Sequence, residues 1–306
     1  MAKETTGKRT VTSKPTTGKR ATPGKRATPG RKGKGLKVYI SADMEGIGGV
    51  VNWDETGREG LGDYDRARKL MAGEVNAAIE GALAAGATEI LVNDSHNSMR
   101  NLIIEDLNPA ARLISGSPKA MSMMEGLDGS FDAVFFVGYH ARATTLGVLN
   151  HTYTGSLLEY RVNGQILGET GMNAATAGDH GVPVVLVTGD GTVCAEARAL
   201  LGGVETVAVK EYIGRYAANS LHPTKSRALI KEAAERALKG LGKVKPLKAR
   251  RPVRVELKFN ATSLADGACL MPGVERVDDL TAAWEGSDYL QAVRAARAMI
   301  SLAGRT

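Results

Sequence analysis

Four short apolar runs, separated by helical or polar segments, restrict the fold of this chain more than any other feature. Each run is continuous and rich in Val, Ile or Phe, as in strands that are buried on both faces of a parallel sheet. The segment 63–86 has apolar residues at helical spacing and stops at a glycine, which predicts a helix. The apolar runs span residues 36–43, 88–96, 132–140 and 182–190. This alternation predicts an α/β domain of three layers, α/β/α, around a mainly parallel sheet.

The remaining segments predict a second, smaller part. Residues 156–169 alternate between apolar and polar on both sides of Asn163-Gly164, a strong signal for a hairpin. In the last third we expect helices, one basic strand and, over residues 278–304, a terminal pair of helices. We therefore predict the α/β domain over residues 36–195 and a smaller α+β domain over residues 196–306.

The basic charge of the chain is concentrated in an N-terminal tail. The net charge is +7, but residues 1–35 contain eleven Lys or Arg and one Glu, whereas the other residues carry 29 basic and 32 acidic side chains. Near-repeats punctuated by Gly and Pro, with no apolar anchor, predict that this tail is disordered. It has no aromatic residue for base stacking, so we expect at most a weak contact with nucleic acid or another polyanion.

The sequence favours a cytoplasmic location. No apolar run approaches the ~18–20 residues of a membrane span. No apolar segment follows the basic N-terminus, so a secretory signal is not expected. Cys194 and Cys269 share no motif, and we expect them to be reduced, buried thiols.

The first apolar run ends at Asp43, and Glu45 and three glycines follow it, in Tyr39–Gly49 (YISADMEGIGG). The glycines match neither phosphate-binding glycine pattern, and no lysine accompanies them. Asp43 and Glu45 are two residues apart, so at an extended strand end their side chains lie on the same face. Two carboxylates would repel a phosphate. We therefore interpret the acids as the functional groups and the glycines as a tight turn around them.

Histidines end two other apolar runs. His96 is the last residue of the second run and His140 that of the third, and ligands of open parallel sheets bind beyond the carboxyl ends of strands. Carboxylates and imidazoles without thiolates suit Zn²⁺, Co²⁺ or Mn²⁺ in a hydrolytic centre. A further acid ligand is best sought after the hairpin, at Glu169, for which the alternative role is an acid at a helix N-terminus that complements the helix dipole. This set would suit two ions about 3.5–4 Å apart with one bridging carboxylate.

We expect different roles for the three other histidines. His151 follows a loop close after His140 and is a candidate acid or base, or a group that stabilises the transition state, rather than a ligand. His180 is expected at a helix end and His222 before Pro223 at a helix start, both with structural roles.

Five ordered motifs carry a resemblance to a known family. Ser41–Gly46 resembles the S-x-D-x-E-G signature of DppA-type D-aminopeptidases, a zinc metallopeptidase family. The resemblance continues through segments 93–101, 137–141, 150–153 and 168–190, and it is looser in the C-terminal third. The basic tail departs from the family pattern.

The resemblance implies a dinuclear zinc enzyme that removes an N-terminal residue, such as D-Ala, from short peptides by means of an activated water. Asp43 would bridge the ions, Glu45 and His96 would complete one site, and His140 and Glu169 the other, with His151 as the catalytic histidine. It also implies a ring-like homo-oligomer.

Two alternatives stay open. One is a dinuclear hydrolase of another amide or ester, and the other is a metal-dependent binding protein docked on polyanions by its tail.

Overall fold

The computed structural model describes residues 1, 35–57 and 62–305. The predicted disorder of the basic tail stays a prediction, because residues 2–34 lie outside the described residues. Gly35–Thr306 form one compact unit, and the following description concerns this unit.

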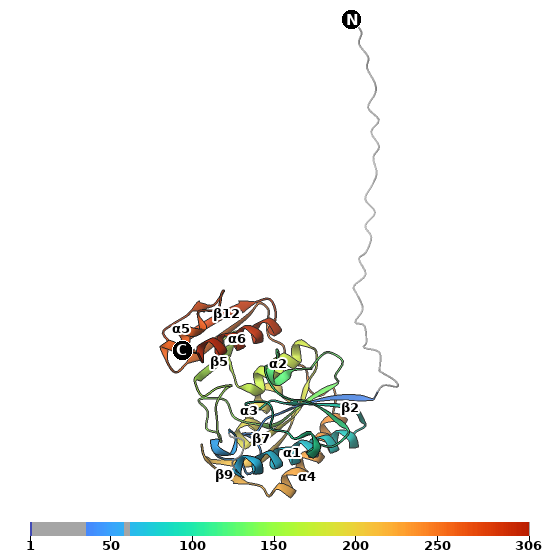
Figure 1. The fold of residues 1–306 in the computed structure, drawn as a ribbon. Helices are drawn as coiled ribbons and strands as arrows, with labels where there is room; N and C mark the ends of the chain where they lie inside the picture. Colours follow the sequence, from blue (N-terminus) through green and yellow to red (C-terminus); the bar gives the residue numbers. More distant parts are fainter. Residues whose placement is uncertain (2–34, 58–61, 306) are drawn as a thin grey trace. The chain divides into compact units, whose positions relative to one another are not determined.

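A seven-stranded sheet forms the centre of the unit (Figure 1). The first six strands in its spatial order run parallel, and the last is antiparallel to its neighbour. The order is β3 (Ala111–Ile114), β2 (Ala87–Asp94), β1 (Leu36–Ala42), β4 (Ala133–Tyr139), β7 (Val184–Asp190), β8 (Glu205–Gly214) and β9 (Ala217–Ser220). All four predicted apolar runs are strands of this sheet, and the mainly parallel α/β fold is confirmed.

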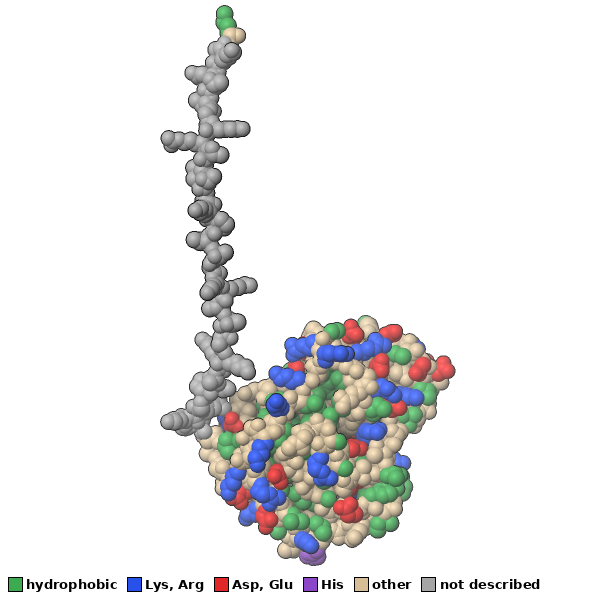
Figure 2. All heavy atoms as spheres, turned by 180° about the vertical axis from the view of Figure 1, so that it is seen from behind, with side chains coloured by type: hydrophobic (Ala, Val, Ile, Leu, Met, Phe, Trp, Pro, Cys, Tyr) green, Lys and Arg blue, Asp and Glu red, His purple; other side chains and the backbone are tan. Residues whose placement is uncertain are grey.

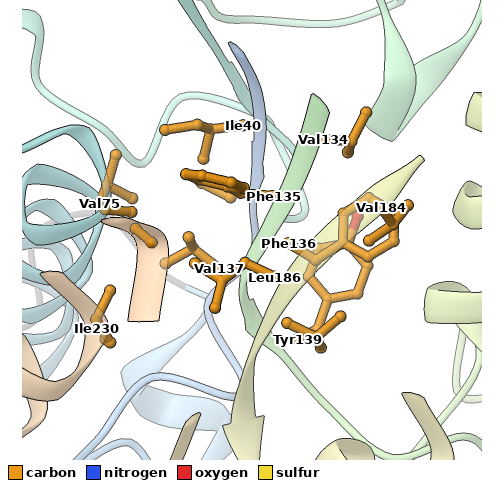
Figure 3. Close-up of a cluster of buried hydrophobic side chains, with 14 of the residues drawn as sticks. Ile40, Val75, Val134, Phe135, Phe136, Val137, Tyr139, Val184, Leu186 and Ile230 are labelled. Atoms are coloured by element: carbon orange, nitrogen blue, oxygen red, sulfur yellow. The ribbon is translucent and has the colours of Figure 1, made fainter. Parts of the chain in front are cut away.

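Helices cover both faces of this sheet. The helices α1 (Gly62–Ala84) and α4 (Pro223–Lys239) pack together on one face, and α2 (Glu169–Asp179) and α3 (Gly191–Leu201) lie on the other (Figure 1). Successive side chains of β4 alternate between the faces, as the pleat of a strand requires. Figure 3 shows Phe135 and Val137 directed toward α1 and α4, and Phe136 directed the other way. All are fully buried, so the core lies on both sides of the sheet.

A second, antiparallel sheet has its own core. Its order is β11 (Glu275–Arg276), β12 (Thr281–Gly286), β10 (Val253–Phe259), β5 (Leu157–Val162) and β6 (Gln165–Leu167). The helices α5 (Thr262–Ala268) and α6 (Tyr289–Ala303) pack on it. Asn163 and Gly164 both have positive φ, 49° and 85°, which is the requirement of the tight hairpin turn predicted there.

The terminal helix pair predicted for residues 278–304 is wrong in its first half. Residues 281–286 form β12, which pairs with β10 on one side and β11 on the other. Alanines favour a helix locally, but pairing with β10 and burial of Thr281, Ala282 and Ala283 outweigh this preference. Only α6 is helical in this segment.

Sheet membership crosses residue 195, where the sequence placed a domain boundary. β8, β9 and α4 extend the first sheet and its helical layer, although they follow that residue. β5 and β6 precede it but belong to the second sheet. The division into 36–195 and 196–306 stays a prediction of domain organisation.

The strand order creates a switch point between β1 and β4. From β1 the chain proceeds to β2 and β3 on one side, and from β4 it proceeds to β7 and β8 on the other. A crevice opens beyond the carboxyl ends of the strands where connections diverge in this way, and such crevices are the usual ligand sites of these sheets. The fold therefore predicts that residues directly after β1 and β4 line a ligand site.

The surface of the unit is mixed in charge. Lys and Arg are interspersed with Asp and Glu over the face shown in Figure 2. Within the described residues, no helix combines the length and the apolar character that crossing a bilayer demands. Cys194 is buried in α3, as expected, whereas Cys269 is only half-buried.

Candidate metal centre

Two glycines let the backbones after β1 and along β4 approach closely. The amide of Asp43 donates to the carbonyl of Val137, and that of Gly46 to the carbonyl of Gly138, both at 2.8 Å. A Cβ on Gly46 would overlap the carbonyl oxygen of Tyr139, and Gly138 has a φ of 75°, a conformation that glycine adopts without cost. The turn thus places both acids of the SADMEG segment beside the end of β4.

We expect Gly46→Ala to lower the free energy of unfolding by about 1–3 kcal/mol, because the added methyl group overpacks backbone that has no room to move. Urea denaturation of the full chain measures this change. Gly203→Ala is the matched control, since its nearest neighbour, the Lys243 carbonyl, would lie at an ordinary 3.5 Å. Equal stability of the two variants would contradict the role given to the close approach.

His96, after β2, directs one ring nitrogen at the two acids. Its Nδ1 lies 3.3 Å from Asp43 Oδ1 and 2.9 Å from Glu45 Oε2. Its Nε2 lies 2.7 Å from the carbonyl oxygen of Thr56, which can only accept, so Nε2 carries a hydrogen and donates it. In the neutral ring the lone pair of Nδ1 then faces both carboxylates.

His140, after β4, repeats this arrangement with the opposite nitrogen. Its Nδ1 lies 3.0 Å from the Ala141 carbonyl and donates to it. Its Nε2 lies 3.6 Å from Asp43 Oδ2 and 3.2 Å from Glu169 Oε1. Glu169 begins α2, and the backbone amide of Tyr153 donates to its Oε1 at 2.7 Å. The two oxygens of Asp43 thus face two different imidazoles.

Buried atoms of these residues lack hydrogen-bond partners. Asp43 Oδ2, Glu45 Oε2 and His140 Nε2 are inaccessible to solvent and make no hydrogen bond within the described structure. Buried polar groups are costly unless they are satisfied, and these converge on one another. Asp43, Glu45 and His96 each offer a ligand atom within 4.8 Å of the others, as do His140, His151 and Glu169. Imidazole and carboxylate donors without thiolate fit divalent zinc, cobalt or manganese.

The pKa values of the clustered side chains also indicate that the site favours bound positive charge, either protons or a cation. Burial, and next the charge of Glu45, raise the pKa of Asp43 to about 7. Burial lowers the pKa of His140, but the charge of Glu169 outweighs it and raises that pKa to about 10. Without a cation the cluster therefore holds extra protons. Divalent cations compete with protons for such ligands, so metal binding would release them.

His151 lies beside the cluster with a free nitrogen. Its Nδ1 donates to the Leu149 carbonyl at 2.9 Å, and its Nε2 lies 3.9 Å from Glu45 Oε1 and 3.8 Å from Glu169 Oε1. The ring stacks on His140 with centroids 4.1 Å apart and meets the edge of Trp53. Burial, and next His140, lower its pKa. A neutral His151 with an unprotonated Nε2 can accept a proton.

The structure brings together all six residues that the sequence singled out. His96 and His140 contact Asp43, and His151 lies near two of the acids at distances longer than a hydrogen bond. Their assignment to individual ions stays a prediction. The two other histidines lie elsewhere, His180 at the end of α2 and His222 at the start of α4, where its side chain accepts from the amide of Thr224.

The sequence did not reveal a buried lysine that holds the turn after Glu45. Lys210 of β8 is 1% exposed, and its ammonium donates to the carbonyls of Glu45, Ile47 and Val50 at 2.5, 3.0 and 2.6 Å. Burial lowers its pKa to about 8, against the opposing charge of Asp190. The sequence signal that could have indicated this role is weak. Lys210 follows alternating valines in a segment for which the sequence predicted no strand.

An α/β sheet with three carboxylates and three imidazoles at its switch point defines a candidate metallohydrolase. The sequence profile of a family described as D-aminopeptidase, Peptidase_M55, matches residues 36–298. The chain belongs to this D-aminopeptidase family.

Two known proteins are similar over most of the chain. A D-aminopeptidase of Bacillus subtilis (strain 168) is 42% identical over 273 residues, which cover 89% of this chain and 99% of that protein. A solved structure, described as the zinc-dependent D-aminopeptidase DppA from Bacillus subtilis, a self-compartmentalizing protease, superimposes with a TM-score of 0.87. Its identity is 41%, with 89% of this chain and 99% of that chain covered. The family expected from the five sequence motifs is thereby confirmed.

Proposed function

We propose that this chain is a zinc-dependent D-aminopeptidase that removes the N-terminal residue, such as D-Ala, from short peptides or amides. The position of the Asp43 carboxylate supports the proposal most directly. Its Oδ1 faces His96 and its Oδ2 faces His140, and each of these imidazoles also lies beside another carboxylate. A carboxylate in this position can bridge two ions. The similar B. subtilis enzyme, described as zinc-dependent, supports zinc as the metal.

The proposed ligands fall into two sets around Asp43. Glu45 and His96 would complete the first ion site, and His140 and Glu169 the second. The carbonyls of Thr56 and Ala141 fix the rings of the two histidines by accepting their other N–H groups. Such supporting hydrogen bonds select the tautomer and the direction of the lone pair.

The remaining chemistry belongs to the protein's own side chains. Two bound ions would activate water and polarise the scissile carbonyl. His151 would accept a proton at Nε2 and transfer it to the leaving amine. Glu45 and Glu169, each within 4 Å of Nε2, would stabilise the imidazolium. Acidic groups in the same cavity offer a partner for the substrate's free α-amine.

Metal removal tests the proposal directly. We expect a chelator to abolish cleavage of D-alanyl p-nitroanilide and zinc or cobalt to restore it, with about two ions per chain in the active protein. A panel of paired D- and L-aminoacyl p-nitroanilides then measures stereochemical preference. A metal-loaded protein that cleaves none of these amides would refute the peptidase function and favour a binding protein, and cleavage of unrelated esters alone would favour another hydrolase.

Further parts of the proposal concern assembly and location. We propose a homo-oligomer, since the similar solved protein is described as self-compartmentalizing. A ring-like arrangement, a cytoplasmic location and weak polyanion contact through residues 1–35 stay predictions. Sedimentation of the full chain tests whether it forms a homo-oligomer. Comparison with a chain that lacks residues 1–35 tests whether the tail affects turnover.

A further inference from the structure

One guanidinium group lies among the residues that line the cavity at the proposed metal centre. The cavity has a volume of about 480 Å³, within the range of about 300–1,000 Å³ that is usual for small-molecule sites. Asp43, Glu45 and Glu169 form its acidic end, and Arg215 is exposed at its margin. Among the described residues that line this cavity, Arg215 is the only lysine or arginine.

Arg215 is tied to the segment that carries His151. It lies in the turn between β8 and β9, where its carbonyl accepts from the amide of Leu149 at 2.8 Å. Its Nη2 donates to the carbonyl of Asn150 at 3.0 Å, and its guanidinium lies 5.7 Å from the ring centroid of Tyr216. These contacts tie the turn and the guanidinium to the two residues that precede His151, the proposed proton acceptor.

The guanidinium has donors to spare. It carries five N–H groups, of which Nη2 supplies the bond to Asn150. No carboxylate forms an ion pair with Arg215 in the part of the chain that the structure describes. A planar guanidinium binds a carboxylate through two parallel hydrogen bonds, so an anionic group in the cavity would find a matching partner there.

We propose that Arg215 binds the C-terminal carboxylate of the substrate and so favours peptides with a free C-terminus over the corresponding C-terminal amides. This inference rests on the proposed aminopeptidase function. The acidic metal end would hold the scissile amide, and the cation would hold the other end of the same molecule.

A pair of substrates that differ in one charge tests this inference. The metal-loaded full-length protein is assayed with D-Ala-Gly-Gly and with its C-terminal amide, and the ratio of the two kcat/KM values is the readout. We expect the wild type to favour the free acid by about tenfold, a modest factor because the arginine is exposed to solvent. The preference should arise in KM and weaken with salt.

Two variants locate the preference at the guanidinium. Arg215→Gln should bring the acid-to-amide ratio close to one, and Arg215→Lys should retain part of it, since the charge remains but the paired donors are lost. Arg236→Gln, at an exposed arginine of α4, is the matched control and should keep the wild-type ratio. A ratio near one in the wild type, or an unchanged ratio in Arg215→Gln, would overturn the inference. Failure of the wild type to cleave either peptide or any aminoacyl p-nitroanilide would instead refute the proposed function.

Discussion

Asp43→Ala is expected to lower kcat for D-alanyl p-nitroanilide by at least about a thousandfold, because the loss of the bridge removes a ligand from both proposed ions. Glu45→Gln should affect one ion site first. Metal analysis of the two purified variants therefore separates a shared ligand from a single one. We expect Asp43→Ala to retain less metal than Glu45→Gln.

A stability measurement distinguishes a metal ligand from a residue that only supports the fold. Asp43 is buried beside two other carboxylates, and its raised pKa reflects burial and then repulsion by Glu45. Replacing it in the metal-free protein removes that repulsion, so we expect little loss in Tm without metal. In the wild type, added zinc should raise Tm by binding the native state, and Asp43→Ala should lose most of this increase.

The control for this experiment is Glu232→Gln, at an exposed acid of α4. It should keep wild-type turnover, metal content and the response of Tm to zinc. If Asp43→Ala retained two ions per chain and a normal zinc response, Asp43 would not be the bridge and the dinuclear assignment would fail.

Much of the site was predictable because its residues follow strands with a clear sequence pattern. His96 and His140 are the last residues of continuous apolar runs, and the carboxyl ends of parallel strands meet at one edge of a sheet. The glycines after Glu45 also predicted a tight turn, and the close contact of Gly46 with β4 supplies its physical reason. Local pattern and tertiary position agree at these residues.

Other parts depend on contacts that no local pattern encodes. β12 forms because residues 281–286 pair with β10, and the alanines there gave a helical signal. Lys210 supports the turn after Glu45 from β8, about 160 residues later in the chain. Its role follows from the position of β8 in the sheet, and no strand was predicted from the sequence for the residues of β8.

The position of His151 likewise depends on distant contacts. The loop that carries it includes Leu149 with a positive φ of 51° and Val148, whose amide donates to Asp190 Oδ2 at 2.8 Å. Asp190 ends β7. A sequence pattern identifies His151 as a candidate, but only these contacts direct its Nε2 toward Glu45 and Glu169.

His151→Ala is expected to lower kcat by about 10²–10⁴-fold, the usual contribution of a positioned acid or base, and to leave both ions bound. The geometry also groups its Nε2 with His140 and Glu169 as possible ligand atoms, and metal content decides between the two roles. A proton acceptor can be lost without losing an ion, whereas a ligand cannot. Added imidazole, which can occupy the space beside His140, should restore part of the turnover of His151→Ala.

The matched control is His222→Ala, at the exposed start of α4, which should retain turnover and need no imidazole. Loss of one ion from His151→Ala, without rescue by imidazole, would make His151 a ligand. The proton would then have to be transferred by one of the carboxylates, because His151 is the only imidazole that the proposed ion sites leave free among the described residues of this cavity.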